Sequence, residues 1–553
     1  GGIDTNGEDF TVSGVVSGGS NLTVHGFGIL AFANSANSYT GDTLVTDGAL
    51  QADADNVFGS GDIVLSDGTT LIAGGASVSF ANDVYIAPTT IIDTGVNTMT
   101  LDGVVHDNGG AGTISKSGSG TLVLTNGAND FTGGTSINAG TINIDSQTAL
   151  STGAIVMQDG TSLGGASASN FDIANDITIN GTSTVGANAT RFQLDGTVDG
   201  TGKLVLAYAG YLVLRGTNPY SGGTDITSGY VDVSNNDALG TGDLTLGDGA
   251  KLGGYALGVT LANNVILSGT TAVIYASDLT INGDISGPAT LNVLADSGKL
   301  TLTSTNTHAA TSIGAGATLV AGADVNLGTG ALDFAGVGAT LEFANATTFT
   351  HDMTMTADGN IDTAGFNGEI SGAITGAGLV NKAGVGTLTL SNAANAFAGL
   401  TISQGRVDVT SAAATGGGDI TFINGTLGLG GTGPTLTNNL VIGAGDSGII
   451  DNSGGLGPTV DLNGAISGAG DLELLSTGTT WNVAGANTGF TGVLTVTDSR
   501  LVVGNANSIG ANSATLVLDG GTLSSSAVGS LTLAQDIGLV PLSSNFVGGA
   551  NDL

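Results

Sequence analysis

An aromatic residue in an Asn-x-aromatic-x-Gly setting recurs about every 90 residues along this 553-residue chain. The last copy is looser, since Thr488-Gly489 precedes its aromatic, and His308 occupies the one slot without an aromatic. In chain order the aromatics are Tyr39, Phe131, Tyr220, Phe397 and Phe490. With His308 included, the successive intervals are 92, 89, 88, 89 and 93 residues. A period held this closely indicates an array of structural repeats.

The composition suits narrow repeats with many tight turns. The chain has 97 glycines, 6 prolines and no cysteine, so disulfides contribute nothing to its stability. Charged residues make up 10% of the chain, far below the roughly 25% of typical globular domains. Val, Ile, Leu and Ala alternate with Thr, Ser, Asn and Asp almost throughout. This alternation is typical of short strands and argues against disorder.

The net charge is −37, from 46 acidic and 9 basic residues. Binding to a nucleic-acid backbone needs clustered Lys and Arg, so the charge argues against a nucleic-acid partner. It also disfavours direct docking on anionic membranes. An acidic surface keeps a long apolar-cored chain soluble and discourages sideways association. No run of 18 apolar residues predicts a transmembrane helix.

Each period is expected to contain four or five coils, a coil being one circuit of roughly 20 residues. In the second copy, alternating segments separated by Gly or Asn-Gly predict strands at Thr121–Leu124, Thr135–Ile137 and Thr141–Ile144. No 3.6-residue apolar stripe extends over 11 positions, which predicts almost no helix. A β-sandwich array and a β-solenoid could both use such strands. Short Gly- and Asn-rich spacers, the alternation and small inward residues favour the solenoid.

We expect one continuous solenoid over residues 1–553. No basic signal-peptide region opens the sequence, and Asn551-Asp552-Leu553 ends it within a repeat, so we expect a segment of a longer chain. About six super-repeats of ~90 residues are predicted. Their approximate bounds are 14–102, 103–195, 196–282, 283–367, 368–463 and 464–553.

One block of the repeat suggests a family. It reads Lys-x-Gly-x-Gly-Thr-Leu-x-Leu-x-Asn, then Asn-x-Phe-x-Gly, then Thr-x-Ile-x-x-Gly-x-[Ile/Val]-x-[Ile/Val]. This block resembles the autotransporter-associated β-strand repeat, which occurs in passenger domains of Gram-negative autotransporters and related giant surface proteins. Residues 112–144 match it closely, 378–409 match well, and 202–233 match in outline. Degenerate copies lie at 21–52, 290–321 and 470–503.

The resemblance implies a right-handed parallel β-helix that is exported across the outer membrane and displayed on, or released from, the bacterial cell. It also implies an outer-membrane β-barrel outside this segment, and a segment that is not itself membrane-embedded. The predicted function is that of a structural extracellular rod in an autotransporter-like adhesin or fibre protein. Such a rod would act by display, adhesion or self-association. Its expected partners are further copies of itself or surface ligands of a host or neighbouring cell, carbohydrates included.

Two other functions stay open. One is a carbohydrate-binding or carbohydrate-cleaving β-helix, which a groove with clustered aromatics and carboxylates along one face would favour. The other is a polymerising subunit of a surface layer or filament, which contacts between copies would favour.

The sequence predicts no enzyme and no catalytic residue. A polygalacturonase-like site needs paired Asp residues with Gly-His-Gly and Arg-x-Lys, and none of these occurs. Ser162, in Gly-x-Ser-x-Gly, and Ser447, in Gly-Asp-Ser-Gly, fit serine-nucleophile motifs, but a triad also needs a positioned histidine. No motif surrounds any of the four histidines, which are His25, His106, His308 and His351.

No His or Cys spacing indicates zinc. Acidic turns could hold Ca²⁺ weakly through oxygen ligands, and the candidates are Asp62, Asp67, Asp243 and Asp248. No other cofactor is expected. For these and the other turn Asp and Asn residues, we favour solvated turns and hydrogen-bonded ladders. We predict that Tyr39, Phe131, Tyr220, Phe397 and Phe490 are structural anchors that plug the core or pack its corners. A stacking platform for sugars is the alternative.

Overall fold

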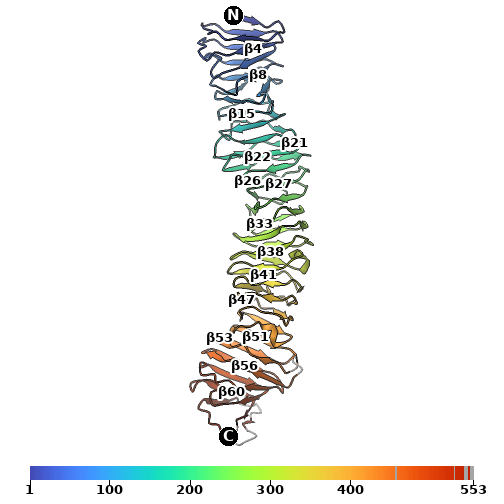
Figure 1. Cartoon of the computed structure of the whole chain (residues 1–553), viewed down its shortest axis with the longest axis vertical. Coiled ribbons are helices and arrows are strands. Elements are labelled where there is room, and N and C mark those ends of the chain that lie inside the picture. Colours follow the sequence, from blue (N-terminus) through green and yellow to red (C-terminus); the bar gives the residue numbers. More distant parts are fainter. Residues whose placement is uncertain (432, 455–456, 528–529, 541–545, 548–553) are drawn as a thin grey trace. The chain divides into compact units, whose positions relative to one another are not determined.

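The structure is a computed structural model that describes residues 1–431, 433–454, 457–527, 530–540 and 546–547. The end of the predicted super-repeat 464–553, with Asn551–Leu553, lies outside these residues. The chain divides into two compact units, Gly1–Ala289 and Thr290–Leu553. Within each unit, short strands lie one above the next in sequence order (Figure 1).

Unit 1 contains β1 to β35, whose strands belong to five parallel sheets. The first sheet contains β1 (Gly2–Asp4), β3 (Leu22–His25), β5 (Thr43–Val45), β7 (Ile63–Leu65), β10 (Val84–Ile86) and β13 (Val105–Asp107). The second contains β2 (Phe10–Val12), β4 (Ile29–Phe32), β6 (Ala49–Ala52), β8 (Thr70–Ala73), β11 (Ile91–Asp93), β14 (Ile114–Ser117), β16 (Thr135–Ile137), β18 (Ile155–Met157), β21 (Ile177–Ile179) and β24 (Val198–Gly200).

The third sheet of unit 1 contains β9 (Ser77–Phe80), β12 (Thr98–Leu101), β15 (Thr121–Leu124), β17 (Thr141–Ile144), β19 (Ser162–Gly165), β22 (Ser183–Ala187), β25 (Leu204–Leu206), β27 (Thr224–Ile226), β29 (Leu244–Leu246), β32 (Val265–Leu267) and β35 (Ile285–Ser286). The fourth contains β20 (Asn170–Ile173), β23 (Arg191–Leu194), β26 (Tyr211–Leu214), β28 (Tyr230–Val233), β30 (Lys251–Gly254) and β33 (Thr271–Ala276). The fifth contains β31 (Val259–Leu261) and β34 (Leu279–Ile281).

Unit 2 contains β36 to β63, in three sheets. One contains β36 (Thr290–Ala295), β38 (Ala310–Ile313), β40 (Leu332–Phe334), β43 (Met353–Thr354) and β46 (Ile374–Thr375). Another contains β52 (Thr435–Leu436), β54 (Thr459–Leu462), β57 (Thr480–Val483), β59 (Arg500–Val503), β61 (Thr522–Ser525) and β63 (Phe546–Val547).

The largest sheet of unit 2 contains β37 (Leu300–Leu302), β39 (Thr318–Ala321), β41 (Ala339–Phe343), β42 (Thr348–Phe349), β44 (Gly359–Asp362), β45 (Gly368–Ile370), β47 (Leu379–Ala383), β48 (Thr387–Leu390), β49 (Gly399–Ile402), β50 (Gly405–Val409), β51 (Ile420–Leu429), β53 (Leu440–Asp451), β55 (Ile466–Gly468), β56 (Asp471–Leu475), β58 (Val493–Thr497), β60 (Thr515–Asp519) and β62 (Asp536–Leu539).

Strand register explains the sequence pattern. Thr121 pairs in parallel with Thr98 on one side and with Thr141 on the other, so one coil takes 23 residues and the next takes 20. In β15 the side chains of Leu122 and Leu124 are buried, whereas Thr121 and Val123 are only half-buried. Alternate residues of a strand face opposite sides, so the apolar set lines the interior. Burying each Leu side chain stabilises the fold by about 2 kcal/mol.

The fold prediction is confirmed within the described residues. The three strands predicted in the second copy are β15, β16 and β17, with the predicted bounds. In the part of the chain that the structure describes, helix is confined to two short 3₁₀ segments, η1 (Asp324–Leu327) and η2 (Ala412–Thr415). None of the described segments is a helix long and apolar enough to cross a membrane. The single continuous solenoid, its handedness and the six super-repeat bounds stay predictions.

The lysine of the Lys-x-Gly-x-Gly block lies in the core. Lys116 and Lys382 are fully buried, and each ammonium group donates to three backbone carbonyl oxygens. Those of Lys116 belong to Ser117, Gly118 and Ala139, at 2.7, 2.7 and 3.0 Å. Those of Lys382 belong to Ala383, Gly384 and Gln404, at 2.6, 2.7 and 3.2 Å. The lysine therefore ties its own bend to the bend of the next coil.

Burial lowers the pKa of Lys116 and of Lys382 to about 8, against the opposing effect of Asp93 and Asp362. Between pH 8 and 9.5 these two ammonium groups are therefore mostly protonated in the unfolded chain and partly deprotonated in the folded chain. The free energy of unfolding should rise over this window by about 1 kcal/mol per lysine. We expect the thermal midpoint of the native chain, followed by circular dichroism, to rise with pH relative to that of the Lys116→Met/Lys382→Met variant. Parallel pH profiles for the two proteins would contradict this account.

Candidate functional site

The five predicted anchors and His308 all lie in the interior, with at most 2% of each residue exposed. Each precedes a strand, as Tyr39 precedes β5 and Tyr220 precedes β27. The Tyr39 hydroxyl hydrogen-bonds with Thr43 Oγ1 at 2.7 Å, and His308 Nε2 with Thr311 Oγ1, also at 2.7 Å. The polar tips are thus satisfied inside the core. These rings offer no surface to a sugar, so the platform alternative does not apply to them.

The asparagine before each anchor joins three coils. Asn37 is 8% exposed, and its Oδ1 accepts from the Val16 amide while its Nδ2 donates to the Val57 carbonyl, both at 2.7 Å. Four further asparagines make the same pair of bonds at 2.7 to 2.9 Å. The partners are Val105 and Ala149 for Asn129, Val198 and Ala238 for Asn218, Ile374 and Ala414 for Asn395, and Ile466 and Ser508 for Asn487.

A second buried amide reaches the same loop from the next coil. Asn82 Nδ2 donates to the Gly61 carbonyl at 2.6 Å, while Asn37 holds the start of that loop at Val57. The equivalent bonds in other copies measure 2.6 to 2.8 Å. They join Asn175 to Gly153, Asn263 to Gly242, Asn438 to Gly418, and Gln535 to Gly510. We call this arrangement the double amide clamp: two buried amides, from adjacent coils, that grip the two ends of one loop.

The clamped loop passes directly over the anchor. Gly59 has φ +65°, and a Cβ atom there would lie 2.3 Å from the Tyr39 carbonyl oxygen. Gly240 has φ +68°, and its Cβ would come equally close to the carbonyl oxygen of Tyr220. Only glycine meets both the positive φ and the close approach at low cost. In the second copy the equivalent residue is Ser151, which also adopts a positive φ, +52°.

The His308 copy keeps the clamp with different chemistry. Asn306 Nδ2 donates to the Asn326 carbonyl at 2.6 Å, as the other asparagines do. On the other side of the loop, His351 replaces the second amide, with Nε2 3.0 Å from the Gly328 carbonyl oxygen. His351 Nδ1 lies 2.7 Å from Asp324 Oδ1. Burial acts to raise the pKa of Asp324, but hydrogen bonds from Thr350 and His351 outweigh it and hold that pKa below the usual value.

This His351–Asp324 pair borders a pocket of about 650 Å³. Both ring nitrogens of His351 face acceptor oxygens of the protein, so the ring links Asp324 to the loop carbonyl of Gly328. The two serines in nucleophile-like motifs lie elsewhere: Ser162 opens β19, and Ser447 lies on β53 with its hydroxyl donating to Asn424 Oδ1. The described residues bring no histidine into hydrogen-bond contact with either serine. The geometry assembles no triad among them.

Three of the four calcium candidates accept hydrogen bonds from the next coil, and for Asp243 the donor is the side-chain amide of Asn264, 3.1 Å from Oδ1. Asp67 Oδ1 accepts from the amide and hydroxyl of Thr89. Asp248 Oδ1 accepts from the amides and hydroxyls of Thr270 and Thr271. The side-chain hydrogen bond from Thr270 and the other bonds lower the pKa of Asp248 to about 2. The carboxylates of Asp67 and Asp248 serve as caps for neighbouring backbone amides.

Within each pair of calcium candidates, the two carboxylates lie at opposite ends of a strand. Asp62 precedes β7 while Asp67 follows it, and Asp243 precedes β29 while Asp248 follows it. A three-residue strand spans about 10 Å. Burial and then the charges of Asp42 and Asp83 raise the pKa of Asp62. Among the described residues no three His, Asp or Glu side chains gather as a group that could hold a metal ion.

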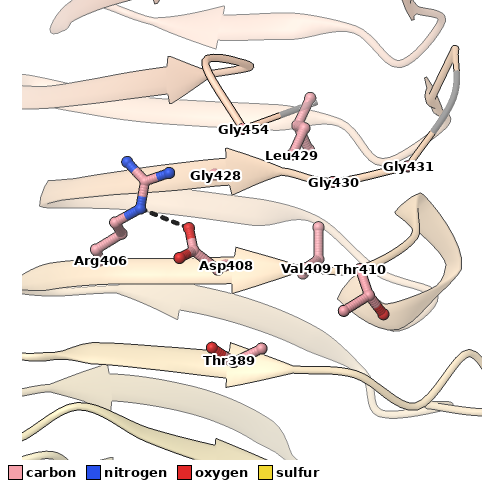
Figure 2. Close-up of a pocket in the computed structure, with 10 residues that line it drawn as sticks. All are labelled: Thr389, Arg406, Asp408, Val409, Thr410, Gly428, Leu429, Gly430, Gly431 and Gly454. Carbon is pink, nitrogen blue, oxygen red and sulfur yellow. Dashed lines mark hydrogen bonds and ion pairs between the residues drawn. The ribbon is translucent and has the colours of Figure 1, made fainter. Parts of the chain in front are cut away.

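A smaller pocket, of about 320 Å³, lies over β50 and β51 (Figure 2). Arg406 bridges two carboxylates there, with Nε 2.5 Å from Asp408 Oδ1 and Nη1 2.6 Å from Asp451 Oδ2. Gly428 leaves room for them, since a Cβ at that position would lie 2.0 Å from Asp408 Oδ1. The one guanidinium of this pocket is thus paired with two carboxylates. The arrangement stabilises the β50–β51–β53 stack and presents no free acid or base.

Two comparisons with known proteins agree with the repeat. The family described as passenger-associated-transport-repeat matches five segments, at 22–52, 114–144, 197–233, 294–321 and 380–409. The adhesin BmaC autotransporter of Brucella suis biovar 1 (strain 1330) is 28% identical over 96% of this chain. The repeats and this relative together support an autotransporter passenger domain that carries passenger-associated transport repeats. The passenger spans 18% of that relative's length, and no solved structure matches it significantly.

The predicted family is therefore confirmed, and with it export across the outer membrane to the cell surface. The sixth predicted copy, 470–503, is not among the matched segments. Its clamp asparagine stands three residues before the anchor Phe490 instead of two. Asn487 nevertheless makes both clamp bonds, so the structure tolerates a spacing that departs from the repeat pattern.

The double amide clamp leads to a stability prediction. Asn129→Ala would leave the Val105 amide and the Ala149 carbonyl buried without partners, at a cost of about 2 to 5 kcal/mol. Asn138→Ala is the matched control, because Asn138 is exposed and the partners of its side chain are the hydroxyls of Ser115 and Ser136. Hydrogen exchange measured by mass spectrometry should quicken over residues 105–153 in the first variant alone. Equal protection in both variants would show that the clamp does not stabilise the coils.

Proposed function

We propose that this passenger segment is a non-catalytic part of a surface adhesin, which spaces and displays contact surfaces outside the cell. One observation carries the proposal: the residues that could have formed sites are used to join coils. The buried asparagines clamp loops, the turn carboxylates cap amides, and His351 and Arg406 have acceptors or carboxylates on their polar atoms. The printed name of the Brucella relative, an adhesin, supports the same role.

The repeat architecture supports a mechanical role. Each coil bonds mainly to the coils before and after it, so stability is close to a sum over neighbours. A clamp in each copy raises the cost of opening one coil without its neighbours. A passenger built in this way can hold a contact surface in place without a cofactor.

Adhesion to another surface is favoured over self-association. The net charge of −37 opposes the approach of a second copy. We therefore place polymerisation into a filament or surface layer second, and ligands on a host or neighbouring cell first.

The adhesive role can be tested on cells. A Gram-negative strain carrying the complete parent protein should adhere to host cells or to neighbouring bacteria. Removal of residues 1–553, with display confirmed by an antibody to the remaining passenger, should reduce adhesion to the level of cells without the protein. Undiminished adhesion would contradict the proposal.

We also propose that Ca²⁺ affects the association of chains and not the folding of the coils. Asp62, Asp67, Asp243 and Asp248 would hold Ca²⁺ between molecules, since no three carboxylates or histidines among the described residues gather to hold it within one chain. Chelation with EDTA should then shift the association state of the purified chain in analytical ultracentrifugation while its thermal midpoint stays constant. A midpoint that collapses on chelation would contradict this, because it would mean that the coils need the metal to fold.

A further inference from the structure

Outward-facing aromatics and cations are concentrated in one part of unit 1. Five of the eight tyrosines lie between positions 208 and 275 and are at least partly exposed. They are Tyr208, Tyr211, Tyr230, Tyr255 and Tyr275. Four of the nine cationic residues fall in the same stretch or just before it, namely Arg191, Lys203, Arg215 and Lys251. In a chain with 5% aromatic residues and a net charge of −37, this concentration is unusual.

Three of these tyrosines form a row on the outer face of the fourth sheet. Tyr211 on β26 is in register with Tyr230 on β28, and their rings stack with centroids 5.0 Å apart at 19°. The Tyr275 ring on β33 lies 5.3 Å from that of Tyr230, tilted by 53°. Between them β30 carries Gly253, where a Cβ would lie 2.2 Å from the Tyr230 hydroxyl. The glycine lets the Tyr230 ring lean across β30 towards the third tyrosine.

The turn after β30 adds a fourth tyrosine beside this row. Tyr255 is 47% exposed, and the guanidinium carbon of Arg215 lies 4.6 Å from the centroid of its ring. Arg215 directly follows β26, and Tyr255 directly follows β30. On the coil between them the equivalent residue is Ser234, whose side chain is small. Leu257, two residues on, is 71% exposed. We call Tyr211, Tyr230, Tyr275, Tyr255 and Arg215 together the tyrosine face.

Polar groups border the tyrosine face. The Tyr211 hydroxyl donates to Asp232 Oδ2. Arg191, in register with Tyr211 on the preceding coil, donates from Nη2 to Asp172 at 2.5 Å and from Nη1 to Gln193 at 2.6 Å. Rings with apolar faces therefore alternate with hydroxyl, carboxylate, amide and guanidinium groups along one edge of unit 1.

Sheet stability alone does not account for this arrangement. A cross-strand aromatic pair such as Tyr211–Tyr230 stabilises a sheet by up to about 1 kcal/mol. Tyr255 and Leu257 lie in a turn outside the strands, and their exposure gains nothing for folding. The exposed Tyr255 and Leu257 are thus available to a ligand beside the stacked rings.

We propose that the tyrosine face binds a neutral glycan, with pyranose rings against the tyrosines and hydroxyl groups on the bordering polar side chains. The inference rests on the proposed adhesive function and names its ligand class. The cluster spans three coil spacings, about 14 Å, and so covers roughly 200 Å². A stable protein partner needs about 800 Å² on each side, whereas a short oligosaccharide fits the smaller surface.

Charge decides between neutral and polyanionic glycans. Three of the four cations lie near carboxylates: Arg191 beside Asp172, Lys203 2.8 Å from Asp225, and Arg215 3.9 Å from Asp195. The surface is thus close to neutral locally, within a chain whose overall field repels polyanions. Paired guanidinium and carboxylate groups can still exchange hydrogen bonds with sugar hydroxyls.

The test uses the whole 553-residue chain and an array of immobilised neutral oligosaccharides built from glucose, galactose and N-acetylhexosamines. Heparin oligosaccharides serve as the polyanionic comparison. The variants are Tyr255→Ala and Arg215→Ala, which lie in or beside exposed turns. The matched control is Tyr85→Ala. Tyr85 is an outward tyrosine of unit 1 that stacks on His106, with ring centroids 4.7 Å apart, and both lie on the first sheet, whereas the stacked rings of the tyrosine face lie on the fourth. Unchanged circular dichroism and thermal midpoints establish that every variant is folded.

We expect the native chain and Tyr85→Ala to bind at least one neutral oligosaccharide, and Tyr255→Ala to lose about tenfold or more in affinity. Binding that is equal in all variants would overturn the assignment of the site. Binding to heparin alone, or to protein-coated but not glycan-coated surfaces, would overturn the ligand class. No glycan binding by a chain whose parent cells still adhere would overturn this inference while leaving the adhesive function intact. Loss of adhesion and glycan binding together on deletion of the segment would agree with both.

Discussion

The double amide clamp is the interaction on which the rest of the structure depends. A loop that crosses over a buried ring has carbonyl and amide groups that water cannot reach, and an unsatisfied buried group costs about 1 to 3 kcal/mol. Asn37 and Asn82 satisfy both ends of one such loop from two different coils. An asparagine amide supplies a donor and an acceptor in one side chain, so Asn37 also bonds to the Val16 amide of the preceding coil. The clamp thus joins consecutive coils through a position that strand pairing does not cover.

The clamp also explains why chemistry-bearing residues in this chain act structurally. His351 takes the place of an amide at Gly328, and the lysine of the Lys-x-Gly-x-Gly block caps three carbonyls. Asp248 gathers four bonds from the next coil. A narrow solenoid exposes many bends whose backbone groups need partners, and polar side chains near the bends are recruited for that purpose. Outward side chains then remain for binding to other molecules. Among the described residues, the tyrosine face is the densest group of outward aromatic side chains.

The sequence predicted those parts of the structure that depend on local pattern. Alternation and glycine spacing gave the bounds of β15, β16 and β17, and the 90-residue period found the interior rings. It did not show which asparagines enter the core: the aromatic motif marks Asn37 as part of the repeat, but nothing in that motif says that Asn37 is buried whereas Asn138 is exposed. Register decides the difference. The same limit hid the tyrosine face, since Tyr211, Tyr230 and Tyr275 become neighbours only when coils of unequal length are stacked. Lys116 is the lysine of the Lys-x-Gly-x-Gly block, but its burial depends on carbonyls contributed by two coils, which the motif does not show.

The central claim can be tested at the amides that donate to the clamp side chains. Site-resolved hydrogen exchange of the native chain should follow the Val105, Val198 and Ile374 amides, which open β13, β24 and β46 and each bond to an asparagine Oδ1. The comparison is with amides that pair one strand with the next. If the clamp holds the coils together, these three amides exchange as slowly as strand amides such as that of Leu122, because they open only when neighbouring coils separate. Exchange as fast as that of exposed turn amides would contradict the account. Strand pairing alone would then hold the coils together, with the asparagines filling space.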